Sequence, residues 1–233
     1  MGESLPIVLI PGLLCSPRMY EPQIPALWAH GPVMVADHTR DDSMAGIARR
    51  ILAQAPPHFV LIGLSMGGYI SFEILRQAPD RVARLGLLDT QARPDTPEQS
   101  ERRRAQIVMA REGKLLEVAD QQFPLMFSPP RHQDERLRAL NRQMAVDVGA
   151  DVLARQQMAI IGRPDSRPDL GAIGCPTLVL VGASDQITPP DRAQEMADAI
   201  PDARLVAIPD CGHLSTLEQP AAVTAALTQW LED

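Results

Sequence analysis

The five-residue segment 63–67, with the sequence GLSMG, carries the clearest chemical signal in the chain. It follows the apolar run 59–62 and precedes a stretch, 68–76, that reads as a buried helix. A G-x-S-x-G segment between a strand and a helix makes a tight turn that exposes the serine hydroxyl, and its glycines avoid collisions with the neighbouring backbone. We therefore predict that Ser65 is a nucleophile. The simpler alternative is a turn serine that only caps the helix.

Two partners for such a serine follow it in the chain. Residues 176–182 form a continuous apolar, β-branched run, which predicts a strand buried on both faces, and Asp185 comes just after it. A second predicted strand, 203–208, leads into a loop that carries His213. Both loops should lie at the carboxyl edge of a parallel sheet, where ligands bind in open α/β folds. The order serine, acid, histidine therefore predicts a catalytic triad.

Five segments together resemble the α/β-hydrolase superfamily, and the resemblance covers nearly the whole chain. They are VLIPGLL at 8–14, GLSMGG at 63–68, LGLLDT at 85–90, GASD at 182–185 and GH at 212–213. The resemblance implies the α/β-hydrolase fold, in which helices flank a mostly parallel central sheet and an inserted helical cap covers one edge. Within the superfamily, the chain looks most like small capped serine esterases and enol-lactonases.

The resemblance also implies an oxyanion hole made of the backbone amides of Leu13 and Met66. Relatives usually carry His-Gly at the first turn, where this chain has Pro-Gly at 11–12, so the histidine that braces this loop is missing. Some relatives place the triad acid where Asp89 stands. The Gly-x-x-Asp turn favours Asp185, and Asp89 remains the alternative.

The implied reaction is hydrolysis of a carboxylic ester, thioester or lactone through an acyl-enzyme on Ser65, with His213 as general base and Asp185 as the orienting acid. Cleavage of carbon–carbon bonds, cofactor-free perhydrolysis and ligand binding without turnover are the alternatives. No metal or other cofactor is expected, because the other histidines are scattered and no glycine-rich phosphate loop is present. Asp37 and His38 are expected in a solvated loop.

The chain divides into segments of different character. Residues 1–90 and 166–233 alternate short strands with helical stretches, which predicts a parallel-sheet core. Residues 91–165 contain helical stretches punctuated by prolines and no strand candidate, so we expect a helical cap over the sheet edge that holds Ser65. Apolar cap residues are candidates for pocket walls, although helix packing explains each of them at least as well. They are Met109, Phe123, Leu125, Met126, Phe127, Met144 and Met158.

Composition favours a soluble, cytoplasmic enzyme, and the resemblance implies that its substrate is a small molecule. The net charge of −7 argues against nucleic-acid binding, and no apolar stretch approaches membrane-spanning length. Three cysteines at unrelated positions and an apolar N-terminal run without a basic leader favour a reducing compartment. Residues 91–165, by contrast, hold 12 basic and 11 acidic residues. Their densest basic cluster, Arg102–Arg104, suggests attraction of an acidic acyl substrate or acidic carrier protein; a solvated helix face is the plainer alternative.

Overall fold

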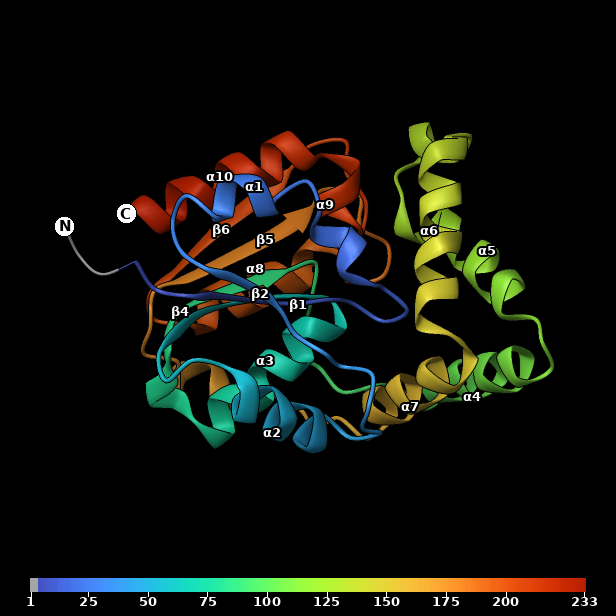
Figure 1. Ribbon diagram of the computed structural model, residues 1–233, viewed down its shortest axis with the longest axis horizontal. Helices are drawn as coiled ribbons and strands as arrows, with labels where there is room; N and C mark the ends of the chain where they lie inside the picture. Colours follow the sequence, from blue (N-terminus) through green and yellow to red (C-terminus); the bar gives the residue numbers. More distant parts are fainter. Residues whose placement is uncertain (1–3) are drawn as a thin grey trace.

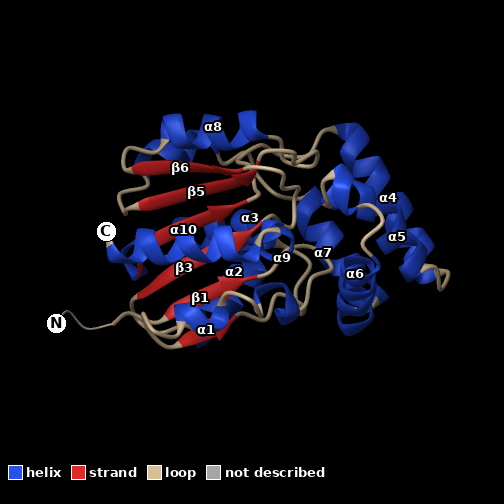
Figure 2. Cartoon of the chain, turned by 90° about the horizontal axis from the view of Figure 1, so that it is seen from above, coloured by secondary structure: helices blue, strands red, loops and turns tan. Residues whose placement is uncertain are grey.

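The centre of the molecule is a six-stranded sheet in which every neighbouring pair of strands is parallel. The computed structural model describes residues 4–233, so the first three residues of the predicted core segment 1–90 lie outside it. The strand order is β2-β1-β3-β4-β5-β6, as Figure 2 shows from above. This sheet confirms the predicted fold class. The strands are β1 (Ile7–Ile10), β2 (Val33–Val35), β3 (Phe59–Leu64), β4 (Val82–Leu88), β5 (Thr177–Gly182) and β6 (Ala203–Ile208).

Helices cover both faces of the sheet, which explains why its central strands are continuous apolar runs. In β5, Leu178 and Leu180 pack toward one face, and Val179 and Val181 pack toward the other. The face with the two valines packs against α2 (Met44–Gln54), α3 (Met66–Gln77) and α8 (Pro190–Ala199). The face with the two leucines packs against α1 (Ile24–Leu27) and α10 (Pro220–Glu232), and α9 (Ser215–Glu218) lies beside α10 (Figure 1).

Four helices between β4 and β5 lie together beyond the carboxyl ends of the strands (Figures 1 and 2). Packing is closest between α4 and α7 and between α5 and α6. We call residues 97–161 the helical insertion. That residues 91–165 form a separate cap on the core of residues 1–90 and 166–233 remains a prediction. Its helices are α4 (Pro97–Arg111), α5 (Leu115–Met126), α6 (Glu135–Val148) and α7 (Ala150–Ile161).

Short 3₁₀ helices complete the chain, at Pro17–Tyr20, Pro79–Arg81, Pro129–Arg131 and Arg167–Ala172. Each begins with proline at its first or second position, where the missing N–H costs no helical hydrogen bond. Across residues 4–233, no helix combines the length and the apolar character that crossing a membrane requires.

The turn between β3 and α3 brings backbone segments into close contact. Ser65 has φ 55° and ψ −114°, a region that residues with a side chain seldom occupy. A Cβ at Gly67 would lie 2.1 Å from the carbonyl oxygen of Ile10, and one at Gly63 would lie 2.3 Å from that of Gly67. Only glycine therefore allows α3 to start this close to β1 and β3.

We predict that Gly67→Ala lowers the melting temperature by about 5 °C or more, because the new methyl group meets backbone that cannot move aside. Gly174→Ala is the matched control, since a Cβ there has no neighbour within 4 Å and Gly174 does not have positive φ. Thermal unfolding followed by circular dichroism measures both variants. Equal melting temperatures for the two variants would contradict this account of the turn.

Candidate active site

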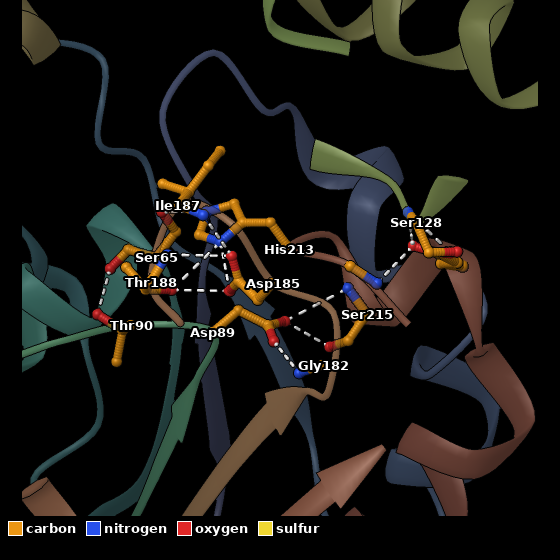
Figure 3. Close-up of polar contacts among 12 residues, drawn as sticks. Ser65, Asp89, Thr90, Ser128, Gly182, Asp185, Ile187, Thr188, His213 and Ser215 are labelled. Carbon is orange, nitrogen blue, oxygen red and sulfur yellow. Dashed lines mark hydrogen bonds and ion pairs between the residues drawn. The ribbon is translucent and has the colours of Figure 1, made fainter. Parts of the chain in front are cut away.

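Three side chains from separate loops form one line of hydrogen bonds at the carboxyl edge of the sheet (Figure 3). The Nε2 atom of His213 lies 2.8 Å from Oγ of Ser65, and its Nδ1 atom lies 2.8 Å from Oδ2 of Asp185. Asp185 and His213 are almost completely buried, and Ser65 is partly exposed. The structure thus brings together the three residues that the sequence predicts to cooperate.

The partners of Asp185 determine which way the imidazole is protonated. Oδ1 accepts hydrogen bonds from the backbone amides of Ile187 (2.8 Å) and Thr188 (3.0 Å), and Oδ2 accepts one from the Thr188 hydroxyl (2.8 Å). All these partners donate, so the carboxylate acts as an acceptor and Nδ1 of His213 carries the donated proton. In the neutral ring Nε2 is then free to accept the proton of the Ser65 hydroxyl.

Burial lowers the pKa of His213, but the charge and hydrogen bond of Asp185, with a smaller effect from Asp89, outweigh it. The pKa of His213 is therefore raised above its ordinary value of 6.5. An imidazole with this shift accepts a proton more readily than a free one, as a general base requires.

Asp89, the alternative acid, makes different contacts. Its fully buried carboxylate accepts hydrogen bonds from the Gly182 amide (2.9 Å) and from the amide and hydroxyl of Ser215 (Figure 3). No hydrogen bond joins it to His213 in the described part of the chain. Burial, followed by repulsion from Asp185, raises the pKa of Asp89 to about 7. Through its hydrogen bonds, Asp89 joins the ends of β4 and β5 to Ser215, the first residue of α9, two residues after His213.

The histidine loop is attached directly to the helical insertion. The carbonyl oxygen of Met126, at the end of α5, accepts hydrogen bonds from the amides of His213 (2.8 Å) and Leu214 (3.1 Å). The buried carboxylate of Glu218 accepts from the amides of Gly212 (2.8 Å) and Ser128 (3.1 Å), and from the Ser128 hydroxyl. Sequence reasoning missed Glu218, although it is the only charged residue between 211 and 219.

The loop after β1 passes beside the serine. A Cβ at Gly12 would lie 3.5 Å from that of Ser65. Among residues 4–233, no hydrogen-bond partner is found for the amides of Leu13 and Met66, the two predicted oxyanion donors. The next amide, that of Leu14, donates to Oε1 of Gln156 on α7 at 3.0 Å. Neither amide is thus committed to another group among the described residues, although Met66 itself is fully buried.

His38 supports the loop after β1, where Pro11 stands in place of the histidine that relatives usually carry. Its side chain is 3% exposed, and Nε2 lies 3.0 Å from the carbonyl oxygen of Gly12, so the expectation of a solvated His38 was wrong. Burial lowers the pKa of His38, against smaller raising effects of Gly12 and Asp37, so the ring is neutral and donates through Nε2. Asp37 is half-exposed and bonds to Thr39 and Arg40.

A pocket of about 240 Å³ contains Ser65 and His213. Of the apolar insertion residues named from the sequence, Leu125 and Met126 line this pocket. The others do not, which corrects the prediction: the apolar stripes of the insertion mark helix packing, and polar residues of α4 form the wall instead. Phe123, Phe127 and Met144 lie in the core, Met109 packs beside Ala110 and Val118, and Met158 is 47% exposed.

The arrangement provides a hydroxyl, a base within hydrogen-bond distance of it, a group that orients the base, and two unpaired amides. These are the parts that nucleophilic acyl transfer requires. In residues 4–233 there is no group of three or more histidine, cysteine or acidic side chains placed to hold a metal ion.

We predict that His38→Ala slows the reaction of Ser65 with a small ester about tenfold, through kcat more than KM, because the Gly12–Leu13 backbone loses its support. His58→Ala is the control, since His58 is exposed and lies outside the pocket lining. Steady-state kinetics measure both variants. A kcat for His38→Ala equal to that of the control would show that the loop needs no brace.

Known proteins resemble this chain in sequence and in fold. The α/β hydrolase fold family matches residues 20–220. A thermophilic esterase from Thermogutta terrifontis, solved with malate bound, is 34% identical and superposes with a TM-score of 0.90 over 100% of this chain and 91% of its own. The enol-lactonase from Burkholderia xenovorans is 27% identical, with a TM-score of 0.88 over 100% of this chain and 93% of its own.

A third relative is the pimeloyl-[acyl-carrier protein] methyl ester esterase from Nitrosomonas europaea, which is 27% identical over 77% of this chain and 73% of its own sequence. Together these similarities confirm the family, fold class and enzyme class predicted from the sequence. The chain belongs to the α/β-hydrolase fold family.

Proposed function

We propose that the protein is a serine hydrolase that cleaves a carboxylic ester, thioester or lactone through an acyl-enzyme on Ser65. The observation that carries this proposal is the unbroken line of hydrogen bonds from Ser65 through His213 to Asp185. A ligand-binding protein without turnover has no need of a base aligned on a strained serine. The esterase and enol-lactonase relatives support the same reaction class.

In the first half of the reaction, Nε2 of His213 takes the proton of the Ser65 hydroxyl while the oxygen attacks the substrate carbonyl. Asp185 stabilises the imidazolium that forms. The imidazolium then gives its proton to the leaving alcohol, thiol or ring oxygen. Water, activated by the same histidine, releases the acid and restores Ser65.

The developing negative charge on the carbonyl oxygen requires donors that are fixed before the reaction. The unpaired amides of Leu13 and Met66 fill this role in the proposal, and one such donor typically contributes about 3 to 4 kcal/mol to transition-state stabilisation. His38 and Gln156 hold the first of these donors in place from either side.

The pocket supports a small substrate. Its volume of about 240 Å³ is below the range of pockets that enclose drug-sized ligands, roughly 300 to 1,000 Å³. The side chains of Leu13, Met126, Ile187 and Leu214 give it apolar surface close to the reacting groups. A short acyl chain fits this volume better than a long one.

Hydrolysis of p-nitrophenyl acetate tests the proposal. Ser65→Ala should lose on the order of 10⁴-fold or more in kcat, and Asp185→Asn about 10³- to 10⁴-fold, because the imidazole loses its orientation and tautomer. Asp89→Asn tests the alternative acid and should be at least about tenfold more active than Asp185→Asn. Ester hydrolysis that persists in Ser65→Ala would reject the mechanism. If Asp185→Asn kept a higher kcat than Asp89→Asn, Asp89 and not Asp185 would be the triad acid.

The pH dependence of kcat/KM should show an acid limb with a midpoint above 6.5, the ordinary value for histidine. The reaction requires neutral His213, which can accept a proton. Because the pKa of His213 is raised, activity is lost by protonation of the ring as the pH falls through that raised value. Because Asp89 contributes to the shift, Asp89→Asn should move the limb to lower pH. A limb below 6.5 in the native enzyme would contradict the proposed electrostatics.

A further inference from the structure

One face of α4 forms a polar wall of the pocket that holds Ser65. Its members are Gln99, Arg102, Arg103 and Gln106, whose spacing of three, one and three residues puts them on the same side of a helix. The pocket lining contains no aspartate or glutamate, although the whole chain carries a net charge of −7. We call these four residues the donor face.

The orientation of Gln106 is fixed by a relay that starts at Arg103. A guanidinium can only donate, so Gln157 must turn its Oε1 toward Nη1 of Arg103 (2.9 Å). The Nε2 of Gln157 then donates to Oε1 of Gln106 at 2.7 Å. This leaves Nε2 of Gln106, for which the described residues provide no partner, as the group available to a ligand.

The side-chain amide of Gln99 is also held in one orientation, by a hydrogen bond in the first turn of α4. Its Oε1 accepts the backbone amide of Thr96 at 2.8 Å, as part of the capping box of α4. A backbone amide can only donate, so the Nε2 of Gln99 is again the free end of the side chain. Both glutamines therefore offer N–H groups, and neither can rotate to offer oxygen without losing a hydrogen bond.

The two arginines differ in how their charges are balanced. Arg103 makes two hydrogen bonds to the buried carboxylate of Asp95 (2.7 and 3.3 Å). Arg102 is exposed, and in residues 4–233 no carboxylate oxygen lies within 4.0 Å of its nitrogens; Glu98, one turn earlier, does not pair with it. Asp95 is shared with Arg163, whose Nη1 lies 2.6 Å from Oδ1, and the charge of Glu98 acts on Arg102 only from beyond ion-pair distance. The donor face therefore presents the guanidinium of Arg102, which has no ion-pair partner within 4.0 Å among the described residues, between two amide donors.

We propose that the donor face binds a carboxylate of the substrate, at the end remote from the bond that Ser65 attacks. The substrate class is then a half-ester of a short dicarboxylic acid, or a lactone that carries a free carboxylate. Hydrolysis adds water across the ester bond. A half-ester gives a dicarboxylate and the free alcohol, and a lactone with a free carboxylate gives a hydroxy dicarboxylate. This inference rests on the proposed function and adds the specificity of its pocket.

The test compares kcat/KM for the monomethyl esters of succinate, glutarate and adipate with neutral esters in which isopropyl replaces the carboxylate. The ratio of the anionic to the neutral ester should exceed one in the native enzyme. Arg102→Gln should lower this ratio about tenfold, as expected for loss of a partly solvated, charged hydrogen bond. Gln106→Glu, which replaces a donor by a carboxylate, should lower it further.

Arg104→Gln is the matched control, because it removes the same charge from the same helix at an exposed position outside the pocket lining. Its ratio should stay within about twofold of the native ratio. A native ratio of one or less would overturn the inference. Equal losses in Arg102→Gln and Arg104→Gln would also overturn it, because they would indicate general attraction to the surface, as for an acidic carrier protein.

A binding measurement separates this inference from the proposed function. Calorimetry of succinate, glutarate and adipate with Ser65→Ala requires no turnover. We expect at least one dicarboxylate to bind Ser65→Ala. Its binding should weaken about tenfold in the double variant Ser65→Ala/Arg102→Gln and stay unchanged in Ser65→Ala/Arg104→Gln. This result would support the donor face even if no ester were hydrolysed. Absence of binding, together with normal hydrolysis of neutral esters, would refute the donor face and leave the proposed hydrolase intact.

Discussion

The backbone of Ser65 is the constraint on which the rest of the site depends. Its φ of 55° and ψ of −114° place the hydroxyl at the top of the sheet, at a cost of about 1 to 3 kcal/mol for such a conformation. Hydrogen bonds from the Ser65 amide to Leu88 and from Thr90 to the Ser65 carbonyl hold the turn from the neighbouring strand. The close approach of Gly67 to Ile10 holds it from the other side. The sheet itself therefore keeps the Ser65 hydroxyl in position.

The histidine is held as firmly, but by contacts of a different origin. Asp185 orients its ring, and the Met126 carbonyl and the Glu218 carboxylate fix its backbone to the helical insertion. The insertion also contacts the loop after β1, because Oε1 of Gln156 accepts a hydrogen bond from the amide of Leu14. The helices beside the pocket thus hold both the His213 loop, through α5, and the loop after β1, through α7.

The sequence was sufficient where a pattern within a short segment determines the structure. The elbow around Ser65 was predictable because its glycines, the preceding apolar run and the following helix are adjacent in the chain. The burial of His38, the contacts of Glu218 and the bond from Gln156 to Leu14 were not predictable, because each joins segments that only the fold brings together. The apolar residues of the insertion were assigned wrongly to the pocket for a different reason. Phe123 and Met144 belong to the hydrophobic core, and hydrophobicity alone does not distinguish a packing surface from a pocket wall.

The central claim is that the geometry around Ser65 activates its hydroxyl, and intact mass spectrometry after treatment with a fluorophosphonate tests it most directly. One covalent adduct is expected on the native protein, none on Ser65→Ala, and much slower labelling on His213→Ala. Failure of the native protein to react with fluorophosphonates of several sizes would contradict the claim. An adduct that forms equally on Ser65→Ala would place the reactive group elsewhere.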